Sequence, residues 1–599
     1  MEKEKLNIGR KSAFSQPLKV DRKGVSFDDY GAKPLVEIDA EDTMYNTFRK
    51  TAKKRMDNIC IRHNKVEKTY SEILNMADNF AAYLSKIGIH EGDIVALPLK
   101  NCIEAAVSLI AINKIGAISK WMDTDKSAKE FYDDLNKCNF KYIIADNGVR
   151  DKLNKYSSEL NITKDNSLYV DSNNYDNNSD FSRILDIGKN YDIDSVQYSK
   201  DKPSLIITSS GSTGLPKEII HSNFSVNSAV KKITYTDYPI KDNIMTVVIP
   251  PFIGLGLVTS LYSSMICGGE AEIISDYTNP FVFVEYIKSN KEKWKKSNKK
   301  VLFFGAPMYY KTLLMKIDEL EDLSFVGAFL AAGSKIEKDQ LLKMDTEFFK
   351  KGCRVPVCNA YGQNEHCGGI TYNTIKSNKQ GSAGKVAYGT RVMIVNPKTK
   401  EELPVNQVGK IVEQSDSQFL GYNNNKAAEK ASEFVDNDGE KWFDTKDLGS
   451  FDEDNFLHIF DREGRAIIRF DNKVSLAKVE NKILKNSIFD DVIVVKVEAP
   501  GPFGIDQAPF AFVTTNGEEH YSYDEIIDKI QLGDYPFTML EMPVWIEYIS
   551  KNAIPYKNAK INYKKLEEVA QRITNEIINQ KVLEELSKEK IMKLDKKDE

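Results

Sequence analysis

The sequence has no apolar run long enough to cross a membrane. A spanning helix needs about 20 predominantly apolar residues, and the most apolar stretches, Ala105–Ile118 and Ile244–Met265, contain Lys114 or are broken by prolines and glycines. The N-terminal residues Met1–Ser15 are charged and have no apolar core of signal-peptide length. We therefore expect a cytoplasmic protein without a membrane span, in which the apolar stretches form core helices and strands.

The sequence also has no excess of one charge sign. The 599 residues include 83 Lys and Arg and 88 Asp and Glu, and the resulting net charge of −5 is spread along the chain. A nucleic-acid-binding surface needs Lys and Arg gathered on one face or helix. We therefore expect no nucleic-acid partner.

Cysteine is sparse and irregularly spaced. There are seven cysteines, an odd number, which favours reduced thiols and an intracellular protein over a disulfide framework. Cys353, Cys358, His366 and Cys367 cluster in the sequence, and a zinc site is one interpretation of them. Their spacing fits no CxxC or HExxH pattern, so ordinary buried thiols are the favoured interpretation.

Helix and strand patterns alternate through most of the chain. Tyr70–Lys86 has apolar residues at helical spacing, and Asp93–Leu99 and Tyr142–Ala145 are short β-rich runs between turn residues. This alternation predicts an α/β fold with layered, mostly parallel sheets. In contrast, Asp151–Asp201 is rich in Asn, Asp, Ser and Tyr and predicts surface loops.

A chain of this length exceeds what one hydrophobic core organises, so at least two domains are expected. The composition changes near Asp461–Arg469, and the residues that follow have their own strand and helix alternation. We predict a large domain over residues 1–461 and a small α+β domain over residues 462–599. The tail after Leu566 predicts a charged amphipathic helix that packs on its own domain, with partner binding as the alternative.

The most informative segment is a glycine- and hydroxyl-rich loop that follows the apolar strand beginning at Ser204. Glycines allow positive φ, so successive N–H groups can converge on an anion, and hydroxyls and a lysine add further donors and charge. The pattern is not GxxxxGK[ST], and a flexible linker rarely follows a buried strand. The phosphate-binding candidates are Ser209, Ser210, Gly211, Ser212, Thr213, Gly214 and Lys217.

This loop resembles the signature loop of the adenylate-forming superfamily, which includes acyl-CoA synthetases, adenylation domains of peptide synthetases and luciferases. Further motifs with the same order resemble that family from about Tyr45 to Leu566. Asn359–Glu365 resembles its Tyr-Gly-x-Thr-Glu segment. The resemblance implies that Tyr361 packs on adenine and that Glu365 coordinates the Mg²⁺ that bridges ATP phosphates. Asn364 stands in place of the usual threonine and still offers a hydrogen-bond donor to a phosphate.

Two motifs resemble the family's ribose-binding and hinge segments. Trp442–Gly449 resembles the Thr-Gly-Asp segment with Lys446 in place of glycine, and a hairpin is expected over Phe451–Ile459. The resemblance implies that Asp447 and Arg462 hold the ribose hydroxyls, although Asp461 replaces the glycine before that arginine. Gly464 falls on the hinge position, where glycine can absorb large φ/ψ changes. A hinge is needed because the small domain serves two reactions in turn.

The resemblance places the catalytic lysine at Lys560. Ile554–Asn562 resembles the closing Pro-x-Thr-x-x-Gly-Lys-Ile motif, with Ala559 in place of glycine. Lys560 would stabilise charge on the carboxylate and the α-phosphate as pyrophosphate leaves, and Lys217 would assist at the phosphate loop.

The segment Ile249–Leu257 occupies the place of the family's acid-pocket entrance. Amino-acid activators carry an aspartate there for the substrate ammonium, but this chain has Ile253. Burying an unpaired ammonium is costly, so an apolar or aromatic acid is expected rather than an α-amino acid. Ala332 and Gly333 are expected to line the same cavity, although core packing explains them as well.

The resemblance implies ATP-dependent formation of an acyl-adenylate with release of pyrophosphate, followed by transfer of the acyl group to a thiol. Coenzyme A is the leading acceptor. CoA-forming relatives have a glycine where this chain has Asp471, so a phosphopantetheine carrier protein stays open as acceptor. A nucleotide-binding relative that has lost turnover also stays open, because the chain departs from the family at Asn364, Lys446, Asp461, Asp471 and Ala559.

Overall fold

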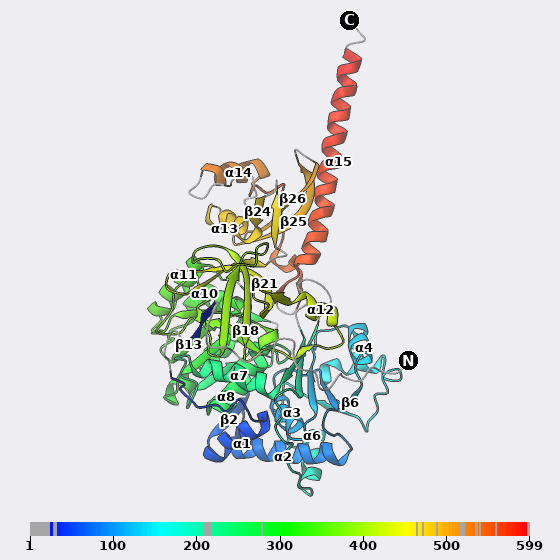
Figure 1. Ribbon diagram of the computed structural model, residues 1–599, viewed down its shortest axis with the longest axis vertical. Coiled ribbons are helices and arrows are strands. Elements are labelled where there is room, and N and C mark those ends of the chain that lie inside the picture. The colour runs from blue at the N-terminus through cyan, green and yellow to red at the C-terminus, as the bar shows by residue number, and fades with distance from the viewer. Residues whose placement is uncertain are drawn as a thin grey trace. The chain divides into compact units, whose positions relative to one another are not determined.

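One of the two largest β-sheets has seven strands (Figure 1). Its strand order is β19-β9-β8-β5-β4-β6-β7, with parallel pairing from β8 to β7 and antiparallel pairing of β8 with β9 and of β9 with β19. The strands are β4 (Ile94–Leu97), β5 (Ile118–Trp121), β6 (Phe140–Asp146), β7 (Ser167–Val170), β8 (Pro203–Thr208), β9 (Glu218–Ser222) and β19 (Gly421–Tyr422).

The other large sheet has nine strands, in the order β16-β15-β14-β13-β12-β10-β11-β2-β3. The pairs from β14 to β2 are parallel, and the pairs at the two ends are antiparallel. The strands are β2 (Ile59–His63), β3 (Val66–Thr69), β10 (Ile244–Val247), β11 (Glu270–Ile273), β12 (Val301–Gly305), β13 (Val326–Ala331), β14 (Val357–Gln363), β15 (Gly368–Tyr372) and β16 (Lys385–Val386).

These sheets belong to a computed structural model that divides into two compact units. The first unit contains most of the chain up to Ile459, and the second contains the residues from Phe460 onward together with Lys446–Leu448. The structure describes residues 24–27, 33–208, 217–276, 279–334, 336–462, 465–469, 472–486, 489–501, 504–515, 521–532, 537, 541–557 and 560–595.

Both large sheets are covered by helices on their two faces, and the strands show this in their side-chain alternation. On β4, Val95 and Leu97 join the central core, while Ile94 and Ala96 face the opposite core. The central core holds α1 (Met44–Lys54), α2 (Tyr70–Lys86), α3 (Ile103–Lys114), α7 (Asn223–Thr234) and α8 (Ser263–Cys267). The outer helices are α4 (Ala128–Asn136) and α5 (Arg150–Asn154) on one sheet, and α9 (Pro280–Lys296), α10 (Pro307–Met315) and α11 (Lys338–Lys350) on the other.

The predicted α/β fold is confirmed, and α2 has the bounds that its apolar spacing predicts. It begins there because the Thr69 side chain accepts a hydrogen bond from the Glu72 N–H while the Glu72 carboxylate accepts from the Thr69 N–H, a capping box. The prediction of surface loops over Asp151–Asp201 is wrong. That segment contains the end of α5, strand β7 and α6 (Asp180–Gly188), because Phe181 and Leu185 give it an apolar face that packs beneath α2.

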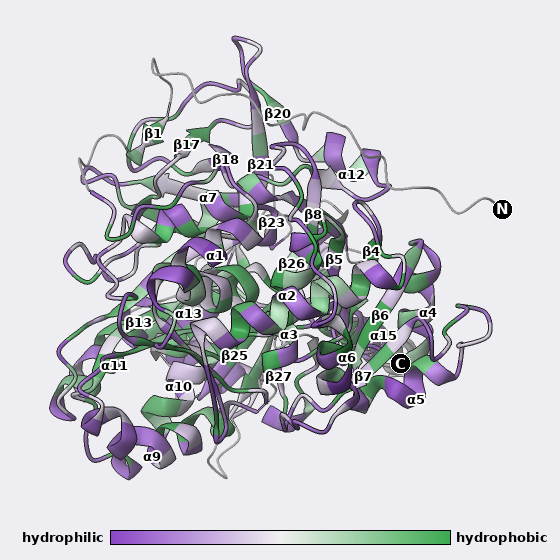
Figure 2. Cartoon of the chain, turned by 90° about the horizontal axis from the view of Figure 1, so that it is seen from below, coloured by the Kyte–Doolittle hydropathy of each residue, from purple (hydrophilic) through white to green (hydrophobic). Residues whose placement is uncertain are grey.

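A third sheet is antiparallel and separate from the two larger ones. It contains β1 (Val25–Ser26), β17 (Thr390–Val395), β18 (Gly409–Ser415), β20 (Glu433–Val435), β21 (Lys441–Phe451) and β22 (Leu457–Arg462). The pairing of β21 with β22 confirms the predicted hairpin. Figure 2 shows hydrophobic colour concentrated on interior strands, whereas the surface helix α12 (Lys426–Ala431) is largely hydrophilic.

The second unit has its own small sheet and helices. Strands β25 (Asp491–Gly501), β26 (Gly504–Thr514) and β27 (Ile546–Tyr548) form the sheet, and β23 (Ala466–Arg469) pairs with β24 (Asn472–Ser475). Helix α13 (Leu476–Asn486) and α14 (Tyr523–Leu532) cover one face of the sheet. The tail forms α15 (Tyr563–Asp595), and Leu566 and Ala570 in its first turns pack on β25. Packing of the rest of the helix on its own domain stays a prediction. The boundary at residue 461 stays a prediction.

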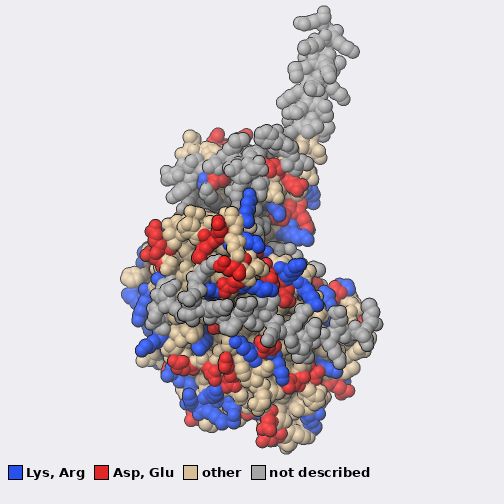
Figure 3. All heavy atoms as spheres, in the orientation of Figure 1, with Lys and Arg blue, Asp and Glu red and all other residues tan. Residues whose placement is uncertain are grey.

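The described helices include none with the length and apolarity that crossing a bilayer requires. On the face drawn in Figure 3, the described Lys and Arg side chains are interspersed with Asp and Glu rather than gathered by sign.

Candidate functional site

The phosphate-loop candidates connect two antiparallel strands. Ser209, Ser210, Gly211, Ser212, Thr213 and Gly214 lie outside the described residues. Their flanks are described: β8 ends at Thr208, β9 begins at Glu218, and these two residues are register partners. Lys217 directly precedes β9, and its Nζ lies 4.8 Å from the centre of the Tyr422 ring. The ends of the loop are therefore held together by a strand pair.

A buried ion pair fixes the start of β9. The carboxylate of Glu218 accepts hydrogen bonds from Lys120 Nζ at 2.5 Å and from Asn423 Nδ2 at 2.7 Å, and Lys120 is only 1% exposed. Burial alone would raise the pKa of Glu218, but the Lys120 charge and the Asn423 hydrogen bond hold that pKa below its ordinary value. The residue that follows Lys217 therefore cannot easily move, and this restrains the backbone of Lys217. Glu218 was not among the predicted site residues, although a carboxylate between Lys217 and two isoleucines is a detectable signal.

The side chain of Asn364 connects three segments of the first unit. It lies in a single helical turn, Asn364–His366, that follows β14 and Tyr361. Its Nδ2 donates to the Thr208 carbonyl at 2.9 Å, and its Oδ1 accepts from the Gly254 N–H at 3.1 Å. One amide hydrogen of Asn364 stays available, so its predicted donation to a phosphate stays a prediction. The turn is thereby joined to the end of β8 and to the predicted acid-pocket segment.

The backbone of the same turn is held by a buried histidine. His221 on β9 donates through Nε2 to the Asn364 carbonyl at 2.8 Å, which makes Nδ1 the acceptor for the Ser225 hydroxyl at 3.3 Å. Burial lowers the pKa of His221 to about 3, against a smaller opposing effect of the Asn364 carbonyl. His221 is therefore neutral around pH 7. It was missed from the sequence because a single histidine in an apolar strand carries no motif.

The two carboxylate oxygens of Glu365 differ in their hydrogen bonding. Its Oε1 accepts from the Tyr422 hydroxyl at 2.9 Å, and its backbone carbonyl accepts from the Phe419 N–H at 2.8 Å. Within the described part of the chain, no hydrogen bond or ion pair reaches Glu365 Oε2. Mg²⁺ keeps most of its waters and takes one or two protein carboxylates besides the substrate phosphates. This donor set therefore fits a Mg²⁺ ion held by Glu365 together with a nucleotide.

The cysteine and histidine cluster has a structural explanation. All seven cysteines are free and buried. His366 is fully buried and its Nε2 is bonded to the buried Glu413, while Cys367 has a φ of +53° and ends the turn. Among the described residues, no group of three or more His, Cys, Asp or Glu side chains is arranged to hold a metal ion. The ordinary-thiol interpretation therefore fits these residues.

The predicted acyl-pocket residues come from neighbouring segments. Strands β13 and β14 are parallel with Ala331 opposite Asn359, so Ala332 and Gly333 follow β13 beside the strand that carries Tyr361. Gly333 has a φ of +90°, and a Cβ placed there would meet no atom within 4 Å, so open space lies in front of it. Ile253 is partly buried and packs against both large cores.

Ile253 also lies next to the Asn364–His366 turn. A Cβ on the following residue, Gly254, would come within 2.8 Å of Cys367 Cα, so the two segments are in close contact. The segment continues into a π-helical turn, Leu255–Tyr262, a feature often found at functional sites. The structure thus brings the predicted acid-pocket entrance and the predicted metal-binding turn together.

The remaining predicted residues lie in the second unit. Arg462 Nε donates to Asp447 Oδ1 at 3.1 Å, so the two predicted ribose ligands are paired with each other. Lys446 has a φ of +61°, the left-handed region that favours glycine, at the position where the resembling family has glycine. Asp461 accepts from the Ala477 N–H at 3.2 Å and so caps α13.

The predicted hinge and catalytic lysine are less fully described. Gly464, Asp471 and Ala559 lie outside the described residues. Lys560 begins β29 (Lys560–Ile561), which pairs with β28 (Tyr556–Lys557) as a short hairpin. The roles of these residues stay predictions.

Comparison with known proteins finds CoA ligases among the relatives of this chain. A 4-coumarate–CoA ligase of Vanilla planifolia is 26% identical over 501 residues, which cover 81% of this chain and 86% of that protein. A 4-coumarate–CoA ligase of Arabidopsis thaliana is 26% identical over 494 residues, covering 76% and 80%.

Solved structures share the fold. ATP-bound MatB from Rhodopseudomonas palustris gives a TM-score of 0.76 at 18% identity, covering 88% of this chain and 99% of that one. The anthranilate CoA ligase AuaEII in complex with anthranoyl-AMP gives a TM-score of 0.76 at 17% identity, covering 91% and 100%.

The family model described as AMP-binding enzyme matches residues 48–423, more than half of the chain. The matched range includes Lys217, the Asn364–His366 turn and Tyr422, and it confirms the adenylate-forming resemblance seen in the motifs. The chain belongs to the AMP-binding enzyme family.

Proposed function

We propose that this protein activates a carboxylic acid with ATP and transfers the acyl group to coenzyme A. In the first reaction a carboxylate oxygen attacks the α-phosphorus of ATP, the bond to pyrophosphate breaks, and an acyl-adenylate forms. In the second, a thiol sulfur attacks the acyl carbon, AMP leaves and the thiol proton is released. The observation that carries the proposal is the open oxygen of Glu365, held beside the strands that flank the phosphate loop in a chain of the AMP-binding family.

The residues of this chain would act by positioning and by charge. The nucleophile is already an anion, so no general base is needed in the first reaction. Lys217 and the loop Ser209–Gly214 would bind phosphates, and Lys560 would stabilise the charge that develops at the α-phosphate. Tyr361 would pack on the adenine, and Asp447 and Arg462 would exchange their mutual contact for the ribose hydroxyls. A Mg²⁺ ion held by Glu365 would neutralise charge on the ATP phosphates.

The substrate we propose is an apolar or aromatic acid. Ile253 offers no charge to an α-ammonium group, whose burial without a partner is costly, and Gly333 leaves open space at the carboxyl edge of the sheet. Relatives named for 4-coumarate, an aromatic acid, agree with this choice. We propose a cytoplasmic location on the evidence of the seven free cysteines.

Carboxylate-dependent ATP–pyrophosphate exchange over a panel of fatty, aryl and α-amino acids tests the activation step. We expect exchange with at least one fatty or aryl acid and a loss of roughly 10²-fold or more in Lys560→Ala. The matched control is Lys564→Ala, an exposed lysine four residues on, which should exchange normally. Tight ATP binding without exchange for any acid would instead identify a nucleotide-binding protein without turnover.

The acceptor is tested separately on an active acid. Adding coenzyme A should convert the acyl-adenylate to a thioester and release AMP. If only a phosphopantetheine carrier protein is acylated, the protein is a carrier-loading ligase, the alternative that Asp471 keeps open. In that case a hinge at Gly464 would still be needed to bring the second unit into each reaction.

A further inference from the structure

One tyrosine contacts two of the residues that the proposed function places at the ATP phosphates. Tyr422 lies in β19 and is buried. Its hydroxyl donates to Glu365 Oε1 at 2.9 Å, and its ring lies 4.8 Å from Lys217 Nζ. Tyr422 was not among the predicted site residues. The structure gives it a contact with each of the two groups on different parts of the same side chain.

We propose that Tyr422 is a positioning residue that orients the Glu365 carboxylate and the Lys217 ammonium for a metal–nucleotide complex. The inference rests on the proposed function and goes beyond it, because that function assigns no role to Tyr422. Its two parts act on different partners, the hydroxyl on the carboxylate and the ring on the ammonium.

The hydroxyl orients Glu365 without neutralising it. A lysine or arginine at this place would pair with the carboxylate and compete with a cation for it. A neutral donor takes only Oε1 and leaves Oε2 for one bond to a metal, which suits an ion that keeps most of its waters. Hydrogen-bond partners of metal-binding carboxylates commonly control metal affinity by 10- to 100-fold.

The ring contacts Lys217 through a cation–π interaction. An ammonium is attracted to the face of an aromatic ring and keeps its charge there. Lys217 is therefore directed by the ring while it can still meet a phosphate. The same ring carries the hydroxyl that binds Glu365, so the relative position of the two charged groups depends on one rigid side chain.

The residues around Tyr422 in the sequence help to fix its position. Leu420 before it donates to the Ile220 carbonyl at 2.7 Å, and Asn423 after it donates from its backbone N–H to the Glu218 carbonyl at 2.9 Å. The ring of Phe419 lies 4.8 Å from the Tyr422 ring, centre to centre. A side chain fixed in this way can orient its partners, whereas a mobile one would follow them.

Two variants separate the parts of the side chain. Tyr422→Phe removes the hydroxyl and keeps the ring, and Tyr422→Leu removes both. Binding of Mn²⁺ is followed by electron paramagnetic resonance with α,β-methylene-ATP, which cannot be cleaved at the bond that the reaction breaks. Binding of the same nucleotide without metal is measured by calorimetry in EDTA. Neither readout depends on turnover.

We expect Tyr422→Phe to weaken Mn²⁺ binding about 10-fold while metal-free nucleotide binding is unchanged. Tyr422→Leu should show the same loss for Mn²⁺ and an additional weakening of metal-free nucleotide binding by about 3-fold, because Lys217 loses the ring. Circular dichroism checks that both variants are folded.

The matched control is Tyr286→Phe. The Tyr286 hydroxyl donates to Glu272 Oε1 at 2.8 Å, so this change removes a tyrosine–glutamate bond of similar length from a different place, near β11. It should leave both affinities unchanged. The inference is overturned if Tyr422→Phe binds Mn²⁺ as tightly as the unaltered protein, or if Tyr286→Phe weakens it equally. If the unaltered protein binds no metal–nucleotide complex at all, the proposed function itself is wrong.

Discussion

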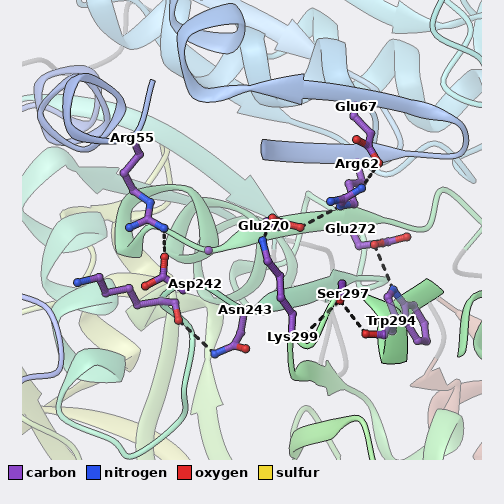
Figure 4. Close-up of polar contacts among 12 residues, drawn as sticks. Arg55, Arg62, Glu67, Asp242, Asn243, Glu270, Glu272, Trp294, Ser297 and Lys299 are labelled. Atoms are coloured by element: carbon purple, nitrogen blue, oxygen red, sulfur yellow. Dashed lines mark hydrogen bonds and ion pairs between the residues drawn. The ribbon is translucent and has the colours of Figure 1, made fainter. Parts of the chain in front are cut away.

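Carboxylates at two places in the first unit are held in opposite ways. On β11 of the nine-stranded sheet, Glu270 lies between Arg62 and Lys299, with Arg62 Nε at 2.9 Å (Figure 4). Glu272 on the same strand is fully buried and accepts from Trp294 Nε1 at 3.3 Å, with Lys293 Nζ at 3.7 Å. At the candidate site, Glu365 has a neutral tyrosine on one oxygen and no described partner on the other.

The difference separates a structural carboxylate from one prepared for a ligand. Cations around Glu270 and Glu272 offset the cost of burying charge and connect β2, β11 and α9. Glu365 is oriented but not neutralised, so it retains its attraction for an added cation. Residue type and position alone would not distinguish them, because all three are glutamates in or next to strands. Cations are the nearest donors to Glu270. The nearest donor to Glu272 is a tyrosine hydroxyl, as it is for Glu365, but the second oxygen of Glu272 also accepts a hydrogen bond and Lys293 Nζ lies 3.7 Å away.

The largest effect that tests this comparison is expected in Glu365→Gln. The amide keeps the size of the side chain and can still accept from Tyr422, but it loses the charge that would bind Mg²⁺. We expect acid-dependent ATP–pyrophosphate exchange to fall by roughly 10²- to 10³-fold, with the free energy of unfolding changed by less than about 1 kcal/mol. Exchange kinetics and urea unfolding measure the two quantities. A large loss of stability with retained exchange would remove the distinction between the two groups.

Glu270→Gln should show the reverse. It leaves Arg62 and Lys299 beside a neutral amide, and breaking a fully buried ion pair costs about 3–5 kcal/mol. Arg62 keeps its contact with Glu67, and the Lys299 side chain is 31% exposed. We therefore expect a smaller loss in the free energy of unfolding, about 2 kcal/mol, measured by urea unfolding. Exchange activity per folded molecule should be unchanged.

The sequence predicts the scaffold and the motif residues better than the contacts around them. Helix α2 and strands β4, β6 and β8 were predicted from apolar patterns, because the apolar residues of each must be buried. The motif around Glu365 was identified by its order in the chain. Tyr422, His221 and Lys120 were not, because each acts through a partner 57, 143 or 98 positions away. Such pairs are created by the fold and leave no local pattern.

The failed prediction of loops over Asp151–Asp201 has a related cause. Its polar composition is genuine, and most of its residues are exposed or partly exposed. Only a few apolar residues, among them Phe181 and Leu185, decide that α6 forms, because α2 offers them a surface to pack on. Tertiary packing outweighs composition there.

A pH dependence of intermediate size should come from His221 at the candidate site. Burial lowers the pKa of His221 to about 3 in the folded state, against about 6.5 in an unfolded chain. Between these values the unfolded state binds more protons, so stability falls as the pH falls below about 6.5 and continues to fall to about 3. The slope is about 1.4 kcal/mol per pH unit.

Urea unfolding at pH 7 and pH 5 measures this effect. Over that interval we expect a loss of roughly 2 kcal/mol from His221. His221→Gln can keep the donation to the Asn364 carbonyl through its amide but has no proton to gain, so it should lose correspondingly less. An unchanged pH dependence in that variant would show that His221 is not the responsible group.

The smallest effect is expected for an ion pair whose N–O distance is short but whose side chains are exposed. Arg183 Nη1 lies 2.9 Å from Asp180 Oδ1 on α6, a distance equal to that between Arg62 Nε and Glu270, but the two side chains are 73% and 71% exposed. Water and salt screen such a pair, so Arg183→Gln should change the free energy of unfolding by less than about 0.5 kcal/mol. Urea unfolding of this variant beside Glu270→Gln compares equal distances at different burial. Equal losses in both would mean that distance, rather than removal from water, determines what the charged group near β11 contributes.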